Sequence, residues 1–316
     1  MERYEKIRLE PLSDSVFSYI FAEPDTIPSM QELINDVLVK AGDMPIKEIS
    51  RMDSQYPVLG EAVDRRGGRL DIRAVAEDNT LFDIEVQLRR QAFMNDRSWF
   101  YGGRMLGEMF SEGQSYEKMP RVRIINLLDF VLRTTQQDYL QPIGVMYRTP
   151  PTEIATDAFR IYNIELPKFR KQYPTMDSVM NDSLARWLYL LDRGYRNDQE
   201  MEVLTTMTEG MQAFARKYNR SLNDPKLRAL YEYELSAERD QHAREYTAKE
   251  EGRAEGLAEG RAEGRAEGRT EGANAARCSM IREMLHNGVS FDIICKCAGL
   301  PRTDVDAIIA KIRKES

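Results

Sequence analysis

Residues 70–90 read LDIRAVAEDNTLFDIEVQLRR, and apolar and polar side chains alternate within this stretch in two short runs. Successive side chains of a β-strand point to opposite faces of a sheet, so the alternation predicts two strands, each with an apolar and a polar face. Residues 77–79 separate the runs and are of the types that favour turns. We therefore expect a β-hairpin.

The polar face of this hairpin carries acids. Asp71 lies on the polar side of the first run, and Glu85 lies on the polar side of the second. If the two strands pair, these carboxylates come close together, and like charges that face each other destabilise a sheet. A bound metal ion would remove the conflict. The alternative is an ordinary solvated sheet face with scattered acids, because alternating strands are common.

Composition places the chain among globular proteins. It has 316 residues, of which 42% are hydrophobic, enough for one large domain or two ordinary ones with a sizeable core. No apolar run approaches the ~18 residues of a membrane span, and the N-terminus lacks a signal-peptide pattern. We expect a soluble, cytoplasmic protein without a membrane partner. Its three cysteines, at positions 278, 295 and 297, are expected to be reduced thiols of a small helical module.

The net charge of −7 does not favour nucleic-acid binding, but the charges are unevenly distributed. Residues 65–104 hold eight arginines against six acids. This stretch is therefore a candidate anion-binding surface, although its acids include the two that the hairpin brings together.

The rest of the chain predicts an α/β protein. In chain order we expect helices within 11–40, a strand in 46–58, the hairpin, a helix over 96–112, a buried strand over 122–130, strands in 143–147 and 159–166, and helices in 176–234. This order predicts a mixed sheet flanked by helices, with an added helical part.

Residues 248–272 form a four-residue repeat in which glycine follows each glutamate. Glycine in a helix costs about 1 kcal/mol relative to alanine, so a lone helix here should be marginal. Two such helices could bring their glycine rows together while glutamates face arginines. We predict an oligomerising helix, and the alternative is a flexible linker.

Residues 277–316 predict three short helices that resemble a helix-turn-helix unit. The third helix is expected to begin near Thr303, and acids at positions 304 and 306 follow. A helix that reads DNA is basic near its start, so we favour a packing or pairing module over a DNA reader.

Several segments together resemble the PD-(D/E)xK family transposases, also called recombination-promoting (Rpn) nucleases. LDIRA and FDIEVQLRR match the family's two strand motifs, and Arg97 and Tyr101 match its R-x-x-x-Y helix. Tyr116 fits a later motif, and DSVFSYIF at 14–21 is similar to the N-terminal motif, with Ser18 where lysine is common. The Glu-Gly repeat with a short helical tail is also typical of these proteins.

The resemblance implies a restriction-endonuclease-like mixed sheet flanked by helices, followed by a long Glu-Gly-Arg repeat helix and a small C-terminal helical module. We expect a nuclease-like domain with a helical extension over 1–240, the repeat helix or linker over 241–275, and the C-terminal module over 276–316.

The resemblance also implies a metal site. Asp71 and Glu85 would hold Mg²⁺, for which Mn²⁺ could substitute, and the backbone carbonyl of Val86 would be a further ligand. Gln87 stands where the wider superfamily has lysine; it can orient water but cannot act as a general base.

Further residues are candidates for contact with DNA. Arg97 is expected to contact a phosphate oxygen, and Tyr101 to orient a water or the phosphate. Nearby arginines could add positive charge: Arg73, Arg89 and Arg90. Asp14 is either a helix cap or an additional acid of the site.

The function that follows is a Mg²⁺-dependent DNA endonuclease that promotes recombination or transposition. One alternative is a catalytically weak DNA-binding or assembly protein that keeps the nuclease fold. Another is an interaction scaffold in which the Glu-Gly repeat is the working part. DNA and a second copy of the chain are the expected partners.

Overall fold

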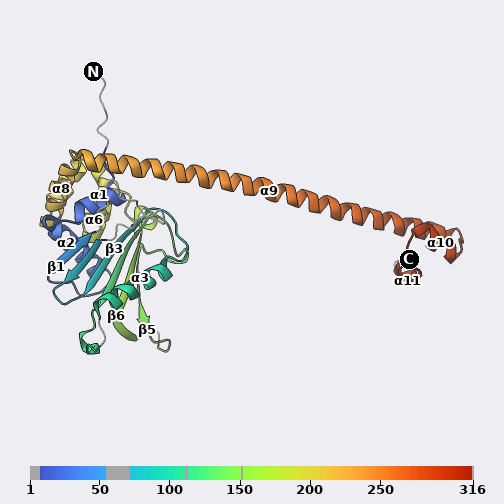
Figure 1. Cartoon of the computed structure of the whole chain (residues 1–316), viewed down its shortest axis with the longest axis horizontal. Helices are drawn as coiled ribbons and strands as arrows, with labels where there is room; N and C mark the ends of the chain where they lie inside the picture. Colours follow the sequence, from blue (N-terminus) through green and yellow to red (C-terminus); the bar gives the residue numbers. More distant parts are fainter. Residues whose placement is uncertain (1–7, 55–71, 111–112, 151, 315–316) are drawn as a thin grey trace, which may run out of the picture. The chain divides into compact units, whose positions relative to one another are not determined.

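The computed structural model describes residues 8–54, 72–110, 113–150 and 152–314 (Figure 1). Contacts within the chain divide it into two compact units, Met1–Ser236 and Ala237–Ser316. Among the described residues, none of the helices combines the length and the apolar character needed to cross a lipid bilayer.

A mixed sheet forms the centre of the first unit. In the described part of the chain it has six strands, in the spatial order β1-β2-β3-β4-β6-β5. β3, β4 and β6 are parallel to one another, and the remaining neighbours pair antiparallel. The bounds are β1 (Ile49–Ser54), β2 (Ile72–Ala76), β3 (Leu81–Gln87), β4 (Val122–Leu128), β5 (Leu140–Met146) and β6 (Ile154–Glu165).

Helices cover both faces of this sheet (Figure 1). One face packs against α1, α2, α4, α6 and α8, and the other is covered by α3. The helices of the first unit are α1 (Asp14–Phe21), α2 (Ile27–Lys40), α3 (Met94–Met109), α4 (Leu166–Gln172), α5 (Met176–Val179), α6 (Ser183–Asp192), α7 (Asp198–Thr205) and α8 (Glu209–Ser221), with 3-10 turns at Pro24–Thr26, Tyr116–Lys118 and Gly194–Arg196. The mixed sheet flanked by helices is the predicted fold class.

The predicted hairpin is confirmed. β2 and β3 pair antiparallel, with Ile72 opposite Ile84, and Asn79 adopts a left-handed conformation in the turn with φ of 63°. Asparagine tolerates this conformation better than most residues. Phe82 and Ile84 are buried in the main core, as the alternation of the sequence predicts.

The polar face of β3 is not solvated. The alternative of a solvated sheet face with scattered acids is therefore wrong for the described residues. Asp83 and Glu85 are each only 2% exposed, because β3 is a central strand and α3 lies over this face. Strands of a parallel sheet are usually buried on both faces, whereas the sequence alternation alone suggested one face in water.

α3 lies very close to the sheet at Gly102. A Cβ atom at this position would be 1.9 Å from Cε2 of Phe159 on β6, so a larger residue could not be accommodated without movement. One turn earlier, Trp99 stacks on the same ring with centroids 4.1 Å apart. The helix predicted over 96–112 begins at Met94 and extends to Met109, and residues 111–112 lie outside the described residues.

Glu32 of α2 ties three helices together on the opposite side of the sheet. Its Oε1 accepts hydrogen bonds from Trp187 Nε1 of α6 at 3.0 Å and from Thr208 Oγ1 at 2.6 Å. Its Oε2 accepts the backbone N–H of Gly210 on α8 at 3.2 Å. A carboxylate that accepts three hydrogen bonds fixes how these helices approach one another.

The repeat lies within a single helix, α9 (Pro225–His286), and not in an irregular segment. Its side chains are exposed throughout the repeat, and a Cβ added at Gly252 or Gly272 would meet nothing within 4 Å. Contacts within the described chain therefore do not require these glycines.

The C-terminal module has its own small core. The end of α9, α10 (Phe291–Ala298) and α11 (Arg302–Lys314) contribute apolar side chains to it, among them Ile281, Ile294 and Ile309. Gly288 and Gly299, with φ of 72° and 63°, turn the chain between the helices. The second and third predicted short helices are present as α10 and α11, whereas the first is the end of α9 and not a separate short helix.

Asp36 of α2 has a raised pKa, of about 6. Burial is the largest cause, because it disfavours the charged form. A hydrogen bond with Ser183 and the positive charge of Arg186 oppose this shift, and the negative charges of Glu32 and Asp182 add to it. The folded protein therefore holds this proton more tightly than the unfolded chain.

We predict that Asp36→Asn stabilises the protein at pH 7 and has little effect at pH 4. A raised carboxyl pKa gives stability that is lost as the pH rises from 3.8 through about 6, and the neutral amide does not titrate. Thermal unfolding from pH 4 to 7.5 measures this, with the exposed Asp138→Asn as the matched control. Equal stability changes at both pH values would contradict the assignment.

Candidate active site

Glu85 lies near the carboxyl end of β3, where the three parallel strands end at one edge of the sheet. Ligands of open α/β sheets commonly bind outside the carboxyl ends of the strands. The loop that follows β3 runs directly into α3, so residues on the loop and on the first turns of the helix lie close to this edge.

The Glu85 carboxylate is buried and engaged by two neighbours. Its Oε1 accepts a hydrogen bond from Gln87 Nε2 at 2.7 Å and lies 3.2 Å from Nη2 of Arg97 on α3. A carboxylate that is 2% exposed needs such partners, because an uncompensated buried charge is strongly destabilising. The structure thus brings together three of the predicted site residues.

Gln91 holds the Gln87 amide from the other side. Gln91 Nε2 donates to Gln87 Oε1 at 2.7 Å, so a short chain of hydrogen bonds runs from Gln91 to Glu85. Arg97 also lies over the ring of Tyr101, with its Cζ 6.0 Å from the ring centroid. Gln91 was not predicted, because its contact with Gln87 depends on the path of the loop after β3.

A row of buried amides continues from Glu85 across the sheet. In the register of the parallel strands, Glu85 pairs with Asn126 of β4, which pairs with Asn163 of β6. Asn126 Nδ2 donates to Asn163 Oδ1 at 2.7 Å and to Ser98 Oγ of α3 at 3.1 Å. Asn163 Nδ2 donates to Asn95 Oδ1, also on α3, at 2.9 Å. We call Glu85, Asn126 and Asn163 the polar row.

The polar row fixes α3 to the sheet. Asn95, Arg97 and Ser98 of its first turns each contact a different strand at the same level. The sequence carries a signal for these residues: the two strands share an R-I-x-N pattern at 123–126 and 160–163, with asparagine inside an apolar run. Buried polar groups need hydrogen-bond partners, so these asparagines indicate polar groups packed above them.

Oxygen donors dominate the described part of this site. The carboxylate of Glu85 and the backbone carbonyl of Val86 are of the type that hard cations such as Mg²⁺ and Mn²⁺ prefer. The chemistry of this donor set fits the metal that the resemblance implies. Among the described residues no cluster of three or more His, Cys, Asp or Glu side chains could hold a metal ion. Asp71 lies outside the described residues.

The other predicted residues lie at different positions on the fold. Arg73 contacts Glu108, near the opposite end of α3 from Arg97, with Nη1 and Oε2 3.5 Å apart. Arg89 is half-buried and Arg90 is exposed, both in the loop after β3. Asp14 is exposed in the first turn of α1.

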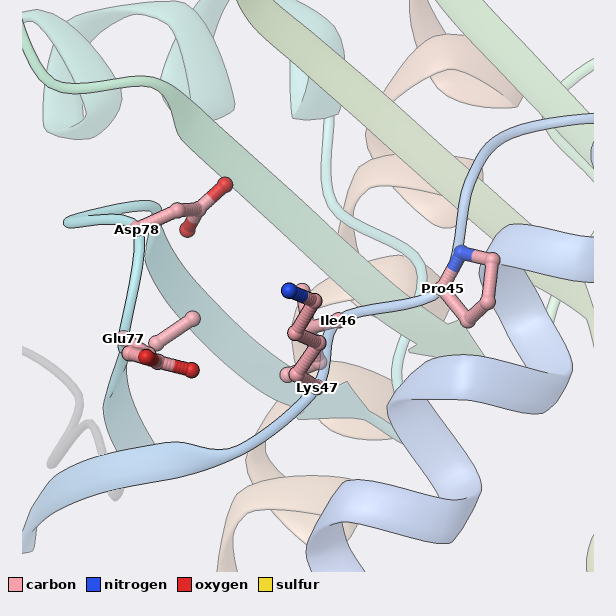
Figure 2. Close-up of a pocket in the computed structure, with 6 residues that line it drawn as sticks. Pro45, Ile46, Lys47, Glu77 and Asp78 are labelled. Carbon is pink, nitrogen blue, oxygen red and sulfur yellow. The ribbon is translucent and has the colours of Figure 1, made fainter.

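A surface hollow of about 290 Å³ lies elsewhere on the sheet. Figure 2 shows Lys47 projecting beside Glu77 and Asp78, near the turn between β2 and β3. This turn is at the opposite end of β3 from Glu85. The hollow is therefore separate from the candidate active site.

Comparison with known proteins identifies the family. The model of the PD-(D/E)XK nuclease family transposases matches residues 11–248. The chain belongs to this family. The matched region contains the entire described sheet together with α3, and the fold is consistent with a PD-(D/E)XK nuclease fold. Membership supports a function of the nuclease or transposase type. No curated protein and no solved structure is significantly similar to the chain.

We predict that Asn126→Ala destabilises this PD-(D/E)XK protein by about 3 kcal/mol, because it deprives two buried acceptors of their donor. Ser98→Ala should cost only about 1 kcal/mol, since Asn126 keeps its bond to Asn163. Urea unfolding at pH 7 measures both values. Equal effects of the two substitutions would show that the bond between the strands contributes nothing.

Proposed function

We propose that the protein is a metal-dependent DNA endonuclease that hydrolyses phosphodiester bonds and thereby promotes recombination or transposition. The observation that carries this proposal is the buried Glu85, held by Gln87 and Arg97 at the carboxyl end of a central strand, within the region matched by the nuclease family. DNA is the proposed substrate. The cytoplasm is the proposed location, in keeping with the free thiols at positions 278, 295 and 297.

Glu85 and Asp71 are the proposed metal ligands, with the backbone carbonyl of Val86 as a third. Mg²⁺ is the proposed ion and Mn²⁺ its substitute, because both take oxygen ligands. When bound, such an ion polarises a phosphoryl oxygen and lowers the pKa of an attacking water. Asp71 immediately precedes β2, the strand that pairs with β3, and this position in the sequence supports its inclusion.

Arg97 is proposed to contact the phosphate. A guanidinium has five N–H donors, and the contact with Glu85 uses only part of this capacity. Its Nε is buried without a hydrogen-bond partner within the described part of the chain, while the side chain as a whole remains 24% exposed. The exposed part of the guanidinium is the part that an incoming phosphate oxygen would meet, and such charge-assisted hydrogen bonds are strong.

Gln87 is proposed to position water rather than to remove its proton. The amide is neutral, and the bonds to Gln91 and Glu85 fix its orientation. One N–H of the amide is directed at Glu85, so the second can point elsewhere.

Tyr101, whose ring lies under the guanidinium of Arg97, is proposed to help hold the phosphate. Further arginines are proposed to attract the DNA backbone: Arg73, Arg89 and Arg90.

A catalytically weak DNA-binding or assembly protein is the second candidate function. The environment of Glu85 favours this second function, because the carboxylate is only 2% exposed and is already paired with Arg97. A cation would have to compete with this guanidinium for the carboxylate.

We predict that Asp71→Asn and Glu85→Gln each lower plasmid nicking in Mg²⁺ by at least about 100-fold, because each removes a proposed metal ligand. Glu77→Gln, an exposed acid at the other end of the hairpin, should nick normally. Gel analysis of supercoiled plasmid with Mg²⁺, Mn²⁺ or EDTA measures the activity. DNA binding without metal-dependent nicking by the wild-type chain would favour the second candidate.

The repeat of α9 is proposed to pair with the same helix of a second copy. It is polar all round and exposed, so packing within the described chain gives it little support, and helices of this kind gain stability from partners. Facing rows of glutamate and arginine would attract each other. The division into 1–240, 241–275 and 276–316 is retained as a proposal.

We predict that the full chain is a dimer, and that a variant ending at Lys249 is a monomer. Arg261→Glu with Arg265→Glu should also weaken the dimer, because these changes place like charges opposite each other. Light scattering after size-exclusion chromatography, at two protein concentrations, measures the mass. An unchanged mass for both variants would exclude the repeat as the pairing element.

A further inference from the structure

Phe93 is an exposed aromatic residue at the start of α3. Its side chain is 78% exposed, and its backbone has φ of 61° and ψ of 33°, in the left-handed region. Bulky residues rarely adopt this conformation. The position precedes the helix as its N-cap, where Phe93 makes no side-chain cap hydrogen bond. Asparagine or glycine would suit both the conformation and the cap better.

The exposure of Phe93 follows from a fixed backbone. The next residue, Met94, is 1% exposed and packs in a small cluster with Leu128 and Phe130. The backbone carbonyl of Phe93 accepts the N–H of Arg97 at 2.9 Å, the first hydrogen bond of the helix. With its carbonyl bonded into the helix and the next residue buried, Phe93 keeps its phenyl ring in solvent.

The surroundings of Phe93 combine positive charge with the candidate active site. Arg89 and Arg90 precede it in the same loop. Arg97, one helical turn later, contacts Glu85, and Gln91 connects to Glu85 through Gln87. An exposed aromatic ring with arginines close to it in the chain has the features that bind unpaired nucleotides, since such a ring can stack on a base while guanidinium groups meet the adjacent phosphates.

We propose that Phe93 stacks on an unpaired base next to the phosphate that the site cleaves, so that the substrate is single-stranded DNA or DNA with locally unpaired strands. This proposal rests on the proposed function. Bases inside an intact duplex are stacked on one another and cannot meet a ring on the protein surface without being extruded. A ring in solvent therefore favours strands whose bases are already exposed.

The test measures DNA binding by the full chain carrying Glu85→Gln, so that cleavage does not interfere. Phe93→Gly and Phe93→Leu remove the aromatic ring, and Phe93→Trp keeps one. Tyr147→Ala is the matched control, because Tyr147 is 52% exposed and follows β5 at the far end of the sheet. The probes are a single-stranded oligonucleotide containing 2-aminopurine and its duplex, both at fixed salt.

We predict that Phe93→Gly and Phe93→Leu weaken binding of the single strand about tenfold, whereas Phe93→Trp and Tyr147→Ala stay within about twofold. Duplex affinity should change less than twofold in every variant. The 2-aminopurine fluorescence should be quenched by the chain with Phe93 or tryptophan, and not by the leucine variant. Phe93→Gly should unfold at the same or a higher temperature, because glycine relieves the left-handed conformation.

Single-strand binding by Phe93→Leu equal to that of Tyr147→Ala would overturn the proposal. Equal losses on single strand and duplex would overturn the assigned substrate class. If the wild-type chain nicks no DNA but Phe93→Leu loses single-strand affinity, the proposed function fails and the base-binding site stands. If nicking depends on Glu85 and Phe93→Leu binds normally, only the base-binding site fails.

Discussion

The candidate site depends on the hydrogen bonds between the polar row and α3. Glu85, Asn126 and Asn163 lie at one level on three neighbouring strands, and the first turns of α3 supply a partner for each. Leaving these hydrogen bonds unmade in a buried setting costs free energy. They therefore fix the position of α3 along the sheet and its rotation about its own axis. Close contact at Gly102 then holds the other half of α3 against β6.

The sequence predicted the sheet because its signals there are local. The alternation of β2 and β3, the turn at 77–79 and the apolar run of β4 are each readable within about ten residues, and the structure has all three. The solvated polar face was wrong because burial of Asp83 and Glu85 depends on α3, which comes later in the chain. Alternation reports which side chains share a face, and it does not report what covers that face.

The site was predictable where a motif carried it and not where tertiary pairing built it. Glu85, Gln87 and Arg97 came from the family motif, and they do meet. Asn126 and Asn163 were missed because each looks like an isolated interruption of an apolar strand, and only the parallel register makes them neighbours. Gln91 and Phe93 were missed because their positions follow from the path of one loop, which sequence patterns do not determine.

The start of one helix therefore carries the groups that would meet two parts of a substrate. Arg97 now balances the charge of Glu85, and a divalent cation bound to that carboxylate would take over this task. The guanidinium would then be available to an incoming phosphate without having to move far, since its helix is fixed by Ser98 and Asn95. Preorganisation of this kind lowers the reorganisation that a transition state requires. Because the carbonyl of Phe93 bonds to the N–H of Arg97, the residue that would meet a base is fixed relative to the residue that would meet the phosphate.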